Sequence, residues 1–416
     1  MTKTEAIRAN RIPTLNRFFT ALLLCAAIVP VANAETFSLD DAISAALSRA
    51  DVETVLLAEV DAAEGRRITA GTRPNPVLGL DREGVDGFSG DGSETILSVE
   101  QSFDFFGRRK LAISGADADI RAAQTGAIAE RAHISSTVTE AFYGVVYAQS
   151  QLDIETTYRD QLSSLLQNTQ TRLEAGDAAQ YDVERIRQAA LNADVSVSRA
   201  EANLLSAEAE FEAVTGLIFS SEQDRLVGEL LPDTTVQDIL LTGNSPYLDR
   251  LQAEADAAAA REQMAGIVAP EVTIGAGVRR IDGPFDETGI LLGVRVPLPL
   301  FDRNQGAYET ALAERRSAEA RVRLEERRIR AEAEGQLQRY DALLTAAQTY
   351  DANALSSSEE LRRIALASYT GGEIAVFEVI DALQTARDAR LQYLELQHDA
   401  RSALIALTAL FPEISQ

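Results

Sequence analysis

Apolar residues along most of this chain recur every three to four positions, the spacing that places them on one face of an α-helix. The pattern predicts six helices, at 38–70, 108–172, 181–215, 235–267, 305–368 and 375–411. At a rise of 1.5 Å per residue, a helix of about 65 residues is roughly 100 Å long. Since a glycine turn separates each long helix from a return helix, we expect two long helical hairpins and not a compact domain.

The return helices carry an apolar seam in which small residues are frequent. In the first return helix the seam consists of Val183, Ile186, Ala190, Ala193, Val197, Ala200, Leu204, Ala207, Phe211 and Val214. In the second it consists of Val379, Ala382, Ala386, Ala389, Tyr393, Leu396, Ala400, Ala403, Leu407 and Leu410. Small seam residues allow two helices to approach closely, so the hairpins are predicted to pack as coiled coils.

Two stretches instead alternate with a period of two, which is typical of half-buried β-strands. They predict one hairpin with strands near 77–87 and 94–104 around a glycine-rich turn, and a second within 270–299. About ten tilted residues suffice to cross a bilayer, and a transmembrane strand alternates apolar and polar side chains. The residues predicted to face lipid are Val272, Ile274, Val278, Ile290, Leu292 and Val294. A soluble hairpin packed on helices is the alternative.

Four strands are too few to close a barrel, and an open sheet edge is not tolerated in lipid because its backbone groups find no water there. Two copies would supply eight strands, and side chains would fill the interior of a barrel of that size. Three copies would supply twelve and leave a lumen. A homotrimer is therefore the smallest pore-forming assembly of such strands.

The order of elements occurs twice because the sequence repeats. Residues 58–63 recur at 253–258, and Phe106-Gly107-Arg108 recurs as Phe301-Asp302-Arg303, both at an offset of 195. Matches in the same order over nearly the whole chain indicate a tandem duplication. We expect a first repeat over 35–220 and a second over 221–416, each with a helix, a β-hairpin and a helical hairpin.

Residues 1–34 have the pattern of a secretory signal peptide. Four basic residues precede an apolar run of about a dozen residues, which is followed by Ala32-Asn33-Ala34, an A-x-A cleavage site. Cleavage would remove Cys25, the only cysteine. It would also remove four basic and one acidic residue, so the formal net charge would fall by three, from −25 to −28. Such an acidic chain is not expected to bind nucleic acid.

The residues that would support catalysis or metal binding are sparse. The mature chain has two histidines, His133 and His398, on different predicted helices, and Met264 is its only methionine. A soft-metal site needs clustered thiolate, thioether or imidazole ligands, and nucleophilic catalysis needs a base beside a nucleophile. We therefore expect no enzyme activity, no cofactor and no dedicated metal site.

The repeated order of helix, hairpin, long helix, glycine turn and return helix resembles the TolC-type outer membrane factors. The run Val294-Arg-Val-Pro-Leu-Pro-Leu-Phe-Asp-Arg-Asn-Gln-Gly306, together with residues 73–76 and 106–110, is similar to the CzcC-like branch of heavy-metal efflux channels. The resemblance implies a mainly α fold with a small β part. It implies a twelve-stranded barrel in the outer membrane, closed by a trimer, above a periplasmic tunnel of helices. It also implies a passive exit channel served by a periplasmic adaptor and an inner-membrane RND-type pump.

The same resemblance assigns roles to the ends of the helical hairpins. The tips facing the adaptor would contain Arg172, Leu173, Gly176, Gly371 and Gly372. Glu378 and Asp381 resemble the acidic rings that close the tunnel of such channels, and Asp182 would accept a hydrogen bond from Tyr369 across the tip. These acids also fit a simpler role, because carboxylates near a helix N-terminus are favoured by the helix dipole.

Two alternatives fit part of the pattern. One is an outer membrane factor that serves multidrug efflux or type I secretion. The other is a periplasmic coiled-coil adaptor. An adaptor would place one helical hairpin within compact β-domains, whereas this chain is expected to have two helical hairpins and paired membrane-type strands.

Overall fold

The computed structural model describes residues 36–87, 90–219, 225–231, 245–268, 270–282 and 286–411. The predicted signal peptide with Cys25, the first ten residues of the helix expected at 235–267, and the centres of both strand turns lie outside the described residues. Within them the fold is mainly helical with a small β part, as the sequence predicted.

The helices are α1 (Leu39–Leu47), α2 (Ala50–Gly71), α3 (Arg108–Ala175), α4 (Gln180–Thr215), α6 (Pro246–Ala265), α7 (Gln305–Tyr350), α8 (Ser356–Thr370) and α9 (Val376–Leu410). A single π-turn, η1 (Asp351–Leu355), separates α7 from α8. The strands are β1 (Thr36–Phe37), β2 (Val77–Gly87), β3 (Gly90–Phe103), β4 (Arg225–Leu226), β5 (Val272–Asp282) and β6 (Glu287–Arg295).

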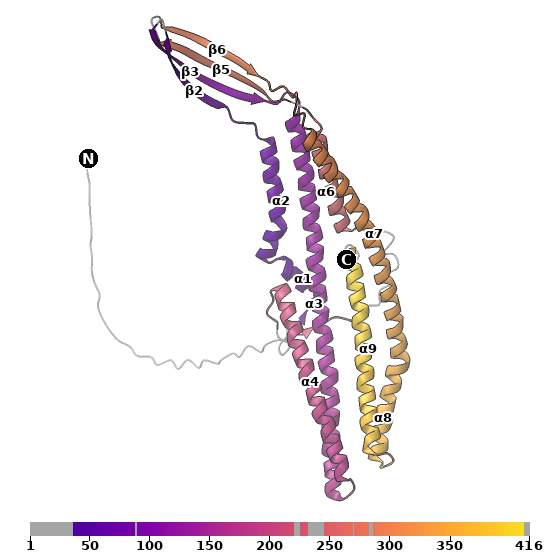
Figure 1. The fold of residues 1–416 in the computed structure, drawn as a ribbon. Coiled ribbons are helices and arrows are strands. Elements are labelled where there is room, and N and C mark those ends of the chain that lie inside the picture. Colours follow the sequence, from indigo (N-terminus) through magenta and orange to yellow (C-terminus); the bar gives the residue numbers. More distant parts are fainter. Residues whose placement is uncertain are drawn as a thin grey trace, which may run out of the picture.

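Two long helical columns run away from the sheet (Figure 1). In the first, α3 packs against α2 on the half nearer the sheet and against α4 on the other half. In the second, α7 packs against α6 near the sheet and against α9 farther away, where α9 also contacts α8. Helices α6 and α9 both contact α3 as well, so the two columns lie side by side.

Both β-hairpins join one antiparallel sheet with the order β2-β3-β5-β6. The central pair, β3 and β5, comes from different halves of the chain, and its register sets Leu97 opposite Val278. The second hairpin sets Val278 opposite Ile290. Strand β3 begins at Gly90, four residues earlier than the sequence predicted, so it includes Gly90 and Gly92 of the expected glycine-rich loop.

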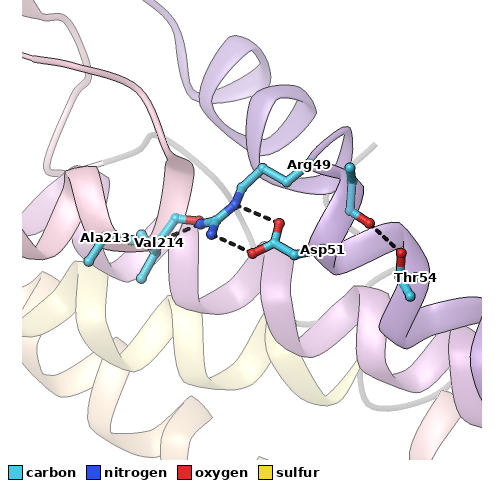
Figure 2. A network of polar contacts seen from close by, with 6 residues as sticks. Arg49, Asp51, Thr54, Ala213 and Val214 are labelled. Carbon is cyan, nitrogen blue, oxygen red and sulfur yellow. Dashed lines mark hydrogen bonds and ion pairs between the residues drawn. The ribbon is translucent and has the colours of Figure 1, made fainter.

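The sequence predicted one continuous helix over 38–70, but the structure divides it into α1 and α2. Arg49 adopts an extended backbone between α1 and α2. Its guanidinium donates to the Ala213 and Val214 carbonyl oxygens at 3.0 and 3.4 Å and pairs with Asp51 at 2.8 Å (Figure 2). These carbonyls end α4, where a cation is favoured by the helix dipole. The break therefore lets Arg49 cap α4 while α2 continues along α3.

The second long helix is also interrupted, although the sequence predicted an unbroken run over 305–368. At η1 the Asn353 side-chain amide donates to the Thr349 carbonyl oxygen at 2.8 Å, and the Ser356 hydroxyl donates to the Ala352 carbonyl oxygen at 3.0 Å. Side chains that compete for backbone carbonyls in this way accompany local widening of a helix.

The predicted seams form much of the helical core. In α9, eight of the ten seam residues are buried, and Tyr393 and Leu396 are half-buried. In α4 the seam is buried from Val183 to Leu204, apart from the half-buried Ala190. Near the end of α4 the buried residues include Glu208 and Thr215, each one position after a predicted seam residue, Ala207 or Val214. There α4 joins a cluster around Phe142, Phe211 and Phe219, beside the two-stranded β1–β4 sheet.

Candidate channel sheet and periplasmic tips

One face of the sheet is apolar over its middle. Successive side chains of a strand point to opposite faces, so the register fixes which residues share a face. The six predicted lipid-facing residues lie on this face, and Ile290 and Leu292 are 84% and 79% exposed. The face also carries Leu78, Leu80, Leu97, Val99 and Phe103. An exposed, continuous apolar surface of this kind needs a covering layer.

The opposite face is polar and rich in glycine. Arg295 forms a two-pronged ion pair with Glu100, with nitrogen–oxygen distances of 2.8 and 3.2 Å, and Arg279 pairs with Glu94 at 3.2 Å. Between the first two partners stands Gly275, where a Cβ atom would come within 3.3 Å of the Glu100 side chain. The glycine therefore leaves room for a charged side chain to cross the sheet.

Each hairpin passes into its long helix through a turn with a left-handed residue. Gly107 precedes α3 with φ of 76°, and Asn304 precedes α7 with φ of 64°. At the first turn Asp104 accepts hydrogen bonds from the backbone N–H groups of Arg109, Arg108 and Phe106. These bonds hold the pKa of Asp104 below its usual value. The recurring Phe-Gly-Arg and Phe-Asp-Arg motifs thus mark the strand-to-helix turns.

Both helical hairpins end in the same turn geometry. The Gly176 N–H donates to the Leu173 carbonyl oxygen and the Asp177 N–H donates to the Arg172 carbonyl oxygen, at 3.0 and 2.8 Å. The corresponding bonds at the second tip join Gly372 to Tyr369 and Glu373 to Ser368. This is the Schellman arrangement, which needs positive φ, and Gly176 and Gly372 have φ of 86° and 72°. Gly371, just before Gly372, is right-handed.

The hydrogen bond expected between Asp182 and Tyr369 does not form. The Tyr369 hydroxyl instead bonds to Thr169 Oγ1 at 2.8 Å in a buried position. Because Thr169 gives its own proton to the Leu165 carbonyl oxygen, the tyrosine must donate to the threonine and has no proton left for Asp182. The sequence did not single out Thr169, whose position one turn before the tip carries no motif.

Tyr369 nevertheless joins the two tips. Arg172 donates to the Tyr369 carbonyl oxygen at 3.3 Å, and its guanidinium lies 5.0 Å from the centre of the tyrosine ring. On the return helices, Arg185 of α4 lies 5.8 Å from the Phe377 ring of α9. Both contacts connect the first helical hairpin with the second.

The predicted gate acids lie beside these contacts. Asp182 is in the first turn of α4 and Glu378 in the first turn of α9, so the Arg185–Phe377 contact brings their helix ends together. Glu378 and Asp381 are exposed, and Asp182 is half-buried. Their side chains have no hydrogen bond or ion pair to the described residues. Both the gate role and the simpler helix-end role fit this geometry.

A link deeper between the hairpins was missed by sequence reasoning. Glu155 of α3 is only 4% exposed and accepts two hydrogen bonds from Arg387 of α9, at 2.8 and 3.0 Å. Arg387 also lies 5.3 Å from the centre of the Tyr158 ring. Burial by itself would lower the pKa of Arg387, but its bonds to Glu155 raise it.

The two histidines lie apart. His133 belongs to α3, whereas His398 of α9 stacks on Tyr147 with ring centroids 4.3 Å apart. Burial lowers the pKa of His398. Among the described residues, no cluster of three or more histidine, cysteine or acidic side chains could hold a metal ion. None of the described helices combines the length and apolarity needed to cross a bilayer.

Paired helical hairpins ending in one two-faced sheet define a class of envelope channel subunit. The chain belongs to the outer membrane efflux protein family, whose sequence model matches residues 43–217 and 240–411. This family comprises channel proteins and not enzymes. The protein is accordingly an outer-membrane efflux channel with a large periplasmic helical part, and the match argues against the periplasmic adaptor alternative.

Two characterised relatives are similar in sequence. The cobalt-zinc-cadmium resistance protein CzcC of Cupriavidus metallidurans is 26% identical over 350 residues, which cover 81% of this chain and 80% of that protein. The nickel-cobalt-cadmium resistance protein NccC of Alcaligenes xylosoxydans xylosoxydans is 28% identical over 327 residues, covering 75% and 71%. These relatives confirm the predicted resemblance to the CzcC-like branch.

Solved structures share the fold. One is CusC, whose crystal structures concern its folding and transmembrane channel formation. It superposes on this chain with a TM-score of 0.71 at 18% identity, over 90% of this chain and 92% of that one. The outer membrane protein VceC of Vibrio cholerae gives a TM-score of 0.71 at 20% identity, over 89% and 95%.

Proposed function

We propose that three copies of this chain close a twelve-stranded barrel in the outer membrane, and that the channel conducts heavy-metal cations out of the cell. The observation that carries the proposal is the sheet with one apolar face, one polar face and two unpaired edges. Strands β2 and β6 each have a partner on one side only in the described sheet. In lipid such edges must be paired.

Pairing between copies satisfies both edges. The order β2-β3-β5-β6 is antiparallel throughout, so β2 and β6 run in opposite directions. β6 of one copy can therefore pair antiparallel with β2 of the next. Three copies give twelve strands, enough to leave a water-filled lumen, with the apolar face toward lipid and the polar face toward water.

The polar face favours cationic cargo. Over residues 77–84, 93–103, 272–282 and 287–295, its charged side chains are five acids and two arginines: Asp81, Glu83, Glu94, Glu100, Glu287, Arg279 and Arg295. A lumen lined in this way concentrates cations. The resistance names of the two relatives point to metal ions as that cargo. The described residues hold no cluster for a bound metal, so the channel acts as a passive conduit and the pump selects the ion.

The family context supplies the partners. Outer membrane factors form trimers and work with adaptors and RND-type pumps, and we propose the same assembly for this chain. The two Schellman turns, with Arg172, Leu173, Gly176, Gly371 and Gly372, form the adaptor-facing tips. We also retain the division into a signal peptide at 1–34 and repeats at 35–220 and 221–416, which the matching tip turns support.

Cation preference is the test of this function. A trimer in a planar bilayer under a potassium chloride gradient should give a reversal potential of the sign expected for cation selectivity. Asp81→Asn removes a charge from the polar face and should weaken the preference. Asp282→Asn removes the same charge from the opposite face and should not. An anion-selective channel, or equal effects of the two variants, would refute the assignment of the polar face to the lumen.

The gate proposal places Asp182, Tyr369, Glu378 and Asp381 where the helices converge on the trimer axis. A ring of like charges at short range is costly unless it is wet or holds cations. Glu378→Gln with Asp381→Asn should therefore change single-channel conductance and divalent-cation block while leaving stability nearly unchanged. Glu373→Gln, an exposed acid in the adjacent turn, is the matched control. Unchanged conductance and block in the double variant would leave only the helix-end role.

A further inference from the structure

A cavity of about 480 Å³ lies where the sheet joins the helices. Its larger apolar lining residues are Pro74, Phe103, Phe105, Met264 and Pro270. Three arginines, Arg73, Arg108 and Arg109, line the same cavity. The site thus combines an apolar surface with three arginine residues, which is the chemistry of an amphipathic anion site.

The arginines are available to a ligand. None of the three guanidinium groups makes a hydrogen bond or ion pair with the described part of the chain. The cavity also contains Asp104 and Glu271, but Asp104 spends both carboxylate oxygens on the backbone N–H groups of the following turn. Three cations therefore face two acids, one of which is already satisfied.

The cavity lies at the end of the sheet that joins the helices. Phe103 ends β3 on the apolar face, opposite Val272 at the start of β5, and Phe103 also lines the cavity. The Phe105 ring lies beside it, with centroids 5.9 Å apart. Aromatic residues mark the two membrane–water boundaries of transmembrane barrels. The arginines thus lie directly below the apolar face, at the level where lipid phosphates are found.

We propose that this cavity binds a glycerophospholipid of the periplasmic leaflet, with its phosphate held by Arg73, Arg108 and Arg109 and its acyl chains along the apolar face of the sheet. Free phosphate would use the arginines but leave the apolar lining unfilled. The proposal rests on the membrane placement of the sheet under the proposed function. One such site per subunit gives three per trimer.

The second half of the chain provides an internal contrast. At its strand-to-helix turn, only Arg303 corresponds to the arginine pair Arg108 and Arg109. Asn304, which takes the left-handed position there, donates to the Ala265 carbonyl oxygen at 2.7 Å. Arg303 does not line the cavity, and its guanidinium makes no hydrogen bond or ion pair with the described residues. Arg303→Gln is therefore a control that removes one arginine charge near the same membrane boundary but outside the cavity.

The experiment is native mass spectrometry of the detergent-solubilised trimer, titrated with dioleoyl phosphatidylglycerol, dioleoyl phosphatidylcholine or inorganic phosphate. The wild-type trimer should retain up to three phosphatidylglycerol molecules, with weaker retention of phosphatidylcholine. Arg73→Gln with Arg109→Gln should weaken phosphatidylglycerol binding by about tenfold or more, because charge-assisted hydrogen bonds are lost. Arg303→Gln should leave it unchanged, and Arg109→Lys, which keeps charge but loses the fork, should fall between.

Several outcomes would overturn the proposal. These are equal retention by the wild type and the double variant, an equal loss in Arg303→Gln, and displacement of the lipid by millimolar inorganic phosphate. Trimer mass is recorded in the same spectra. A wild-type chain that forms no trimer contradicts the proposed channel, whereas an intact trimer without bound lipid contradicts only this site.

Discussion

Arginine in place of Ile274 or Leu292 should abolish assembly of the proposed outer-membrane trimer. Both residues lie near the middle of the apolar face, and an arginine on the lipid side near the bilayer midplane costs roughly 2–4 kcal/mol. Three copies per trimer multiply that cost. The measurement is outer-membrane fractionation followed by gels with and without heating, in which a folded, detergent-resistant trimer migrates differently from the boiled chain.

Neighbouring residues supply matched controls for this prediction. Leu291 and Thr273 each precede a substituted position by one residue on the same strand, and the register puts their side chains on the polar face. Leu291→Arg and Thr273→Arg should therefore give a trimer yield close to that of the wild type. If Ile274→Arg and Leu292→Arg each assemble normally, the sheet does not face lipid.

The strands were predictable because their signal is local. Alternation at 272–278 and 290–294 fixes which side chains share a face without knowledge of the partner strand. The joining of β3 to β5 was not predictable in this way, since residues such as Ser102 and Thr273, whose hydroxyls lie 3.0 Å apart, are 171 positions apart in sequence. Local periodicity carries no information on such pairing.

The helix ends were likewise predictable where the signal is local and not where it depends on residues distant in sequence. The tip turns followed from Gly176 and Gly372, because a left-handed residue at the C-terminal end of a helix is usually glycine. The break at Arg49 has no glycine or proline to announce it, and it exists because that side chain caps carbonyl groups 164 and 165 residues away. The helical spacing of apolar residues in the sequence therefore continues across the position where the structure breaks.

The spacing of the candidate gate acids along α9 was predictable, but the side of the helix that faces the channel axis was not. The spacing from the tip glycine sets Glu378 and Asp381 one turn apart on α9, as the structure has them. Which side of the helix faces the channel axis depends on the other subunits. The partner of Tyr369 was mispredicted for a related reason: Thr169 reaches it across the two hairpins, over 200 residues of sequence.

The buried pair of Glu155 and Arg387 gives the second large expected effect. Removing one partner of a buried ion pair leaves an uncompensated charge and typically costs about 3–5 kcal/mol. Glu155→Ala should accordingly lower the thermal stability of the full-length trimer in detergent, followed by helical circular dichroism. Arg363→Ala breaks an exposed pair with Glu360 on α8 and should change stability little.

A double variant separates the charge from the packing. Glu155→Leu with Arg387→Met replaces the pair by apolar side chains of similar length, and such replacements of buried pairs are often neutral or stabilising. Stability should therefore recover most of the loss seen in Glu155→Ala. Because the pair joins α3 of the first half to α9 of the second, the double variant should also show whether a polar link is needed to hold the two hairpins in register. An equal loss in Glu155→Ala, Arg363→Ala and the double variant would mean that the pair carries no special share of the stability.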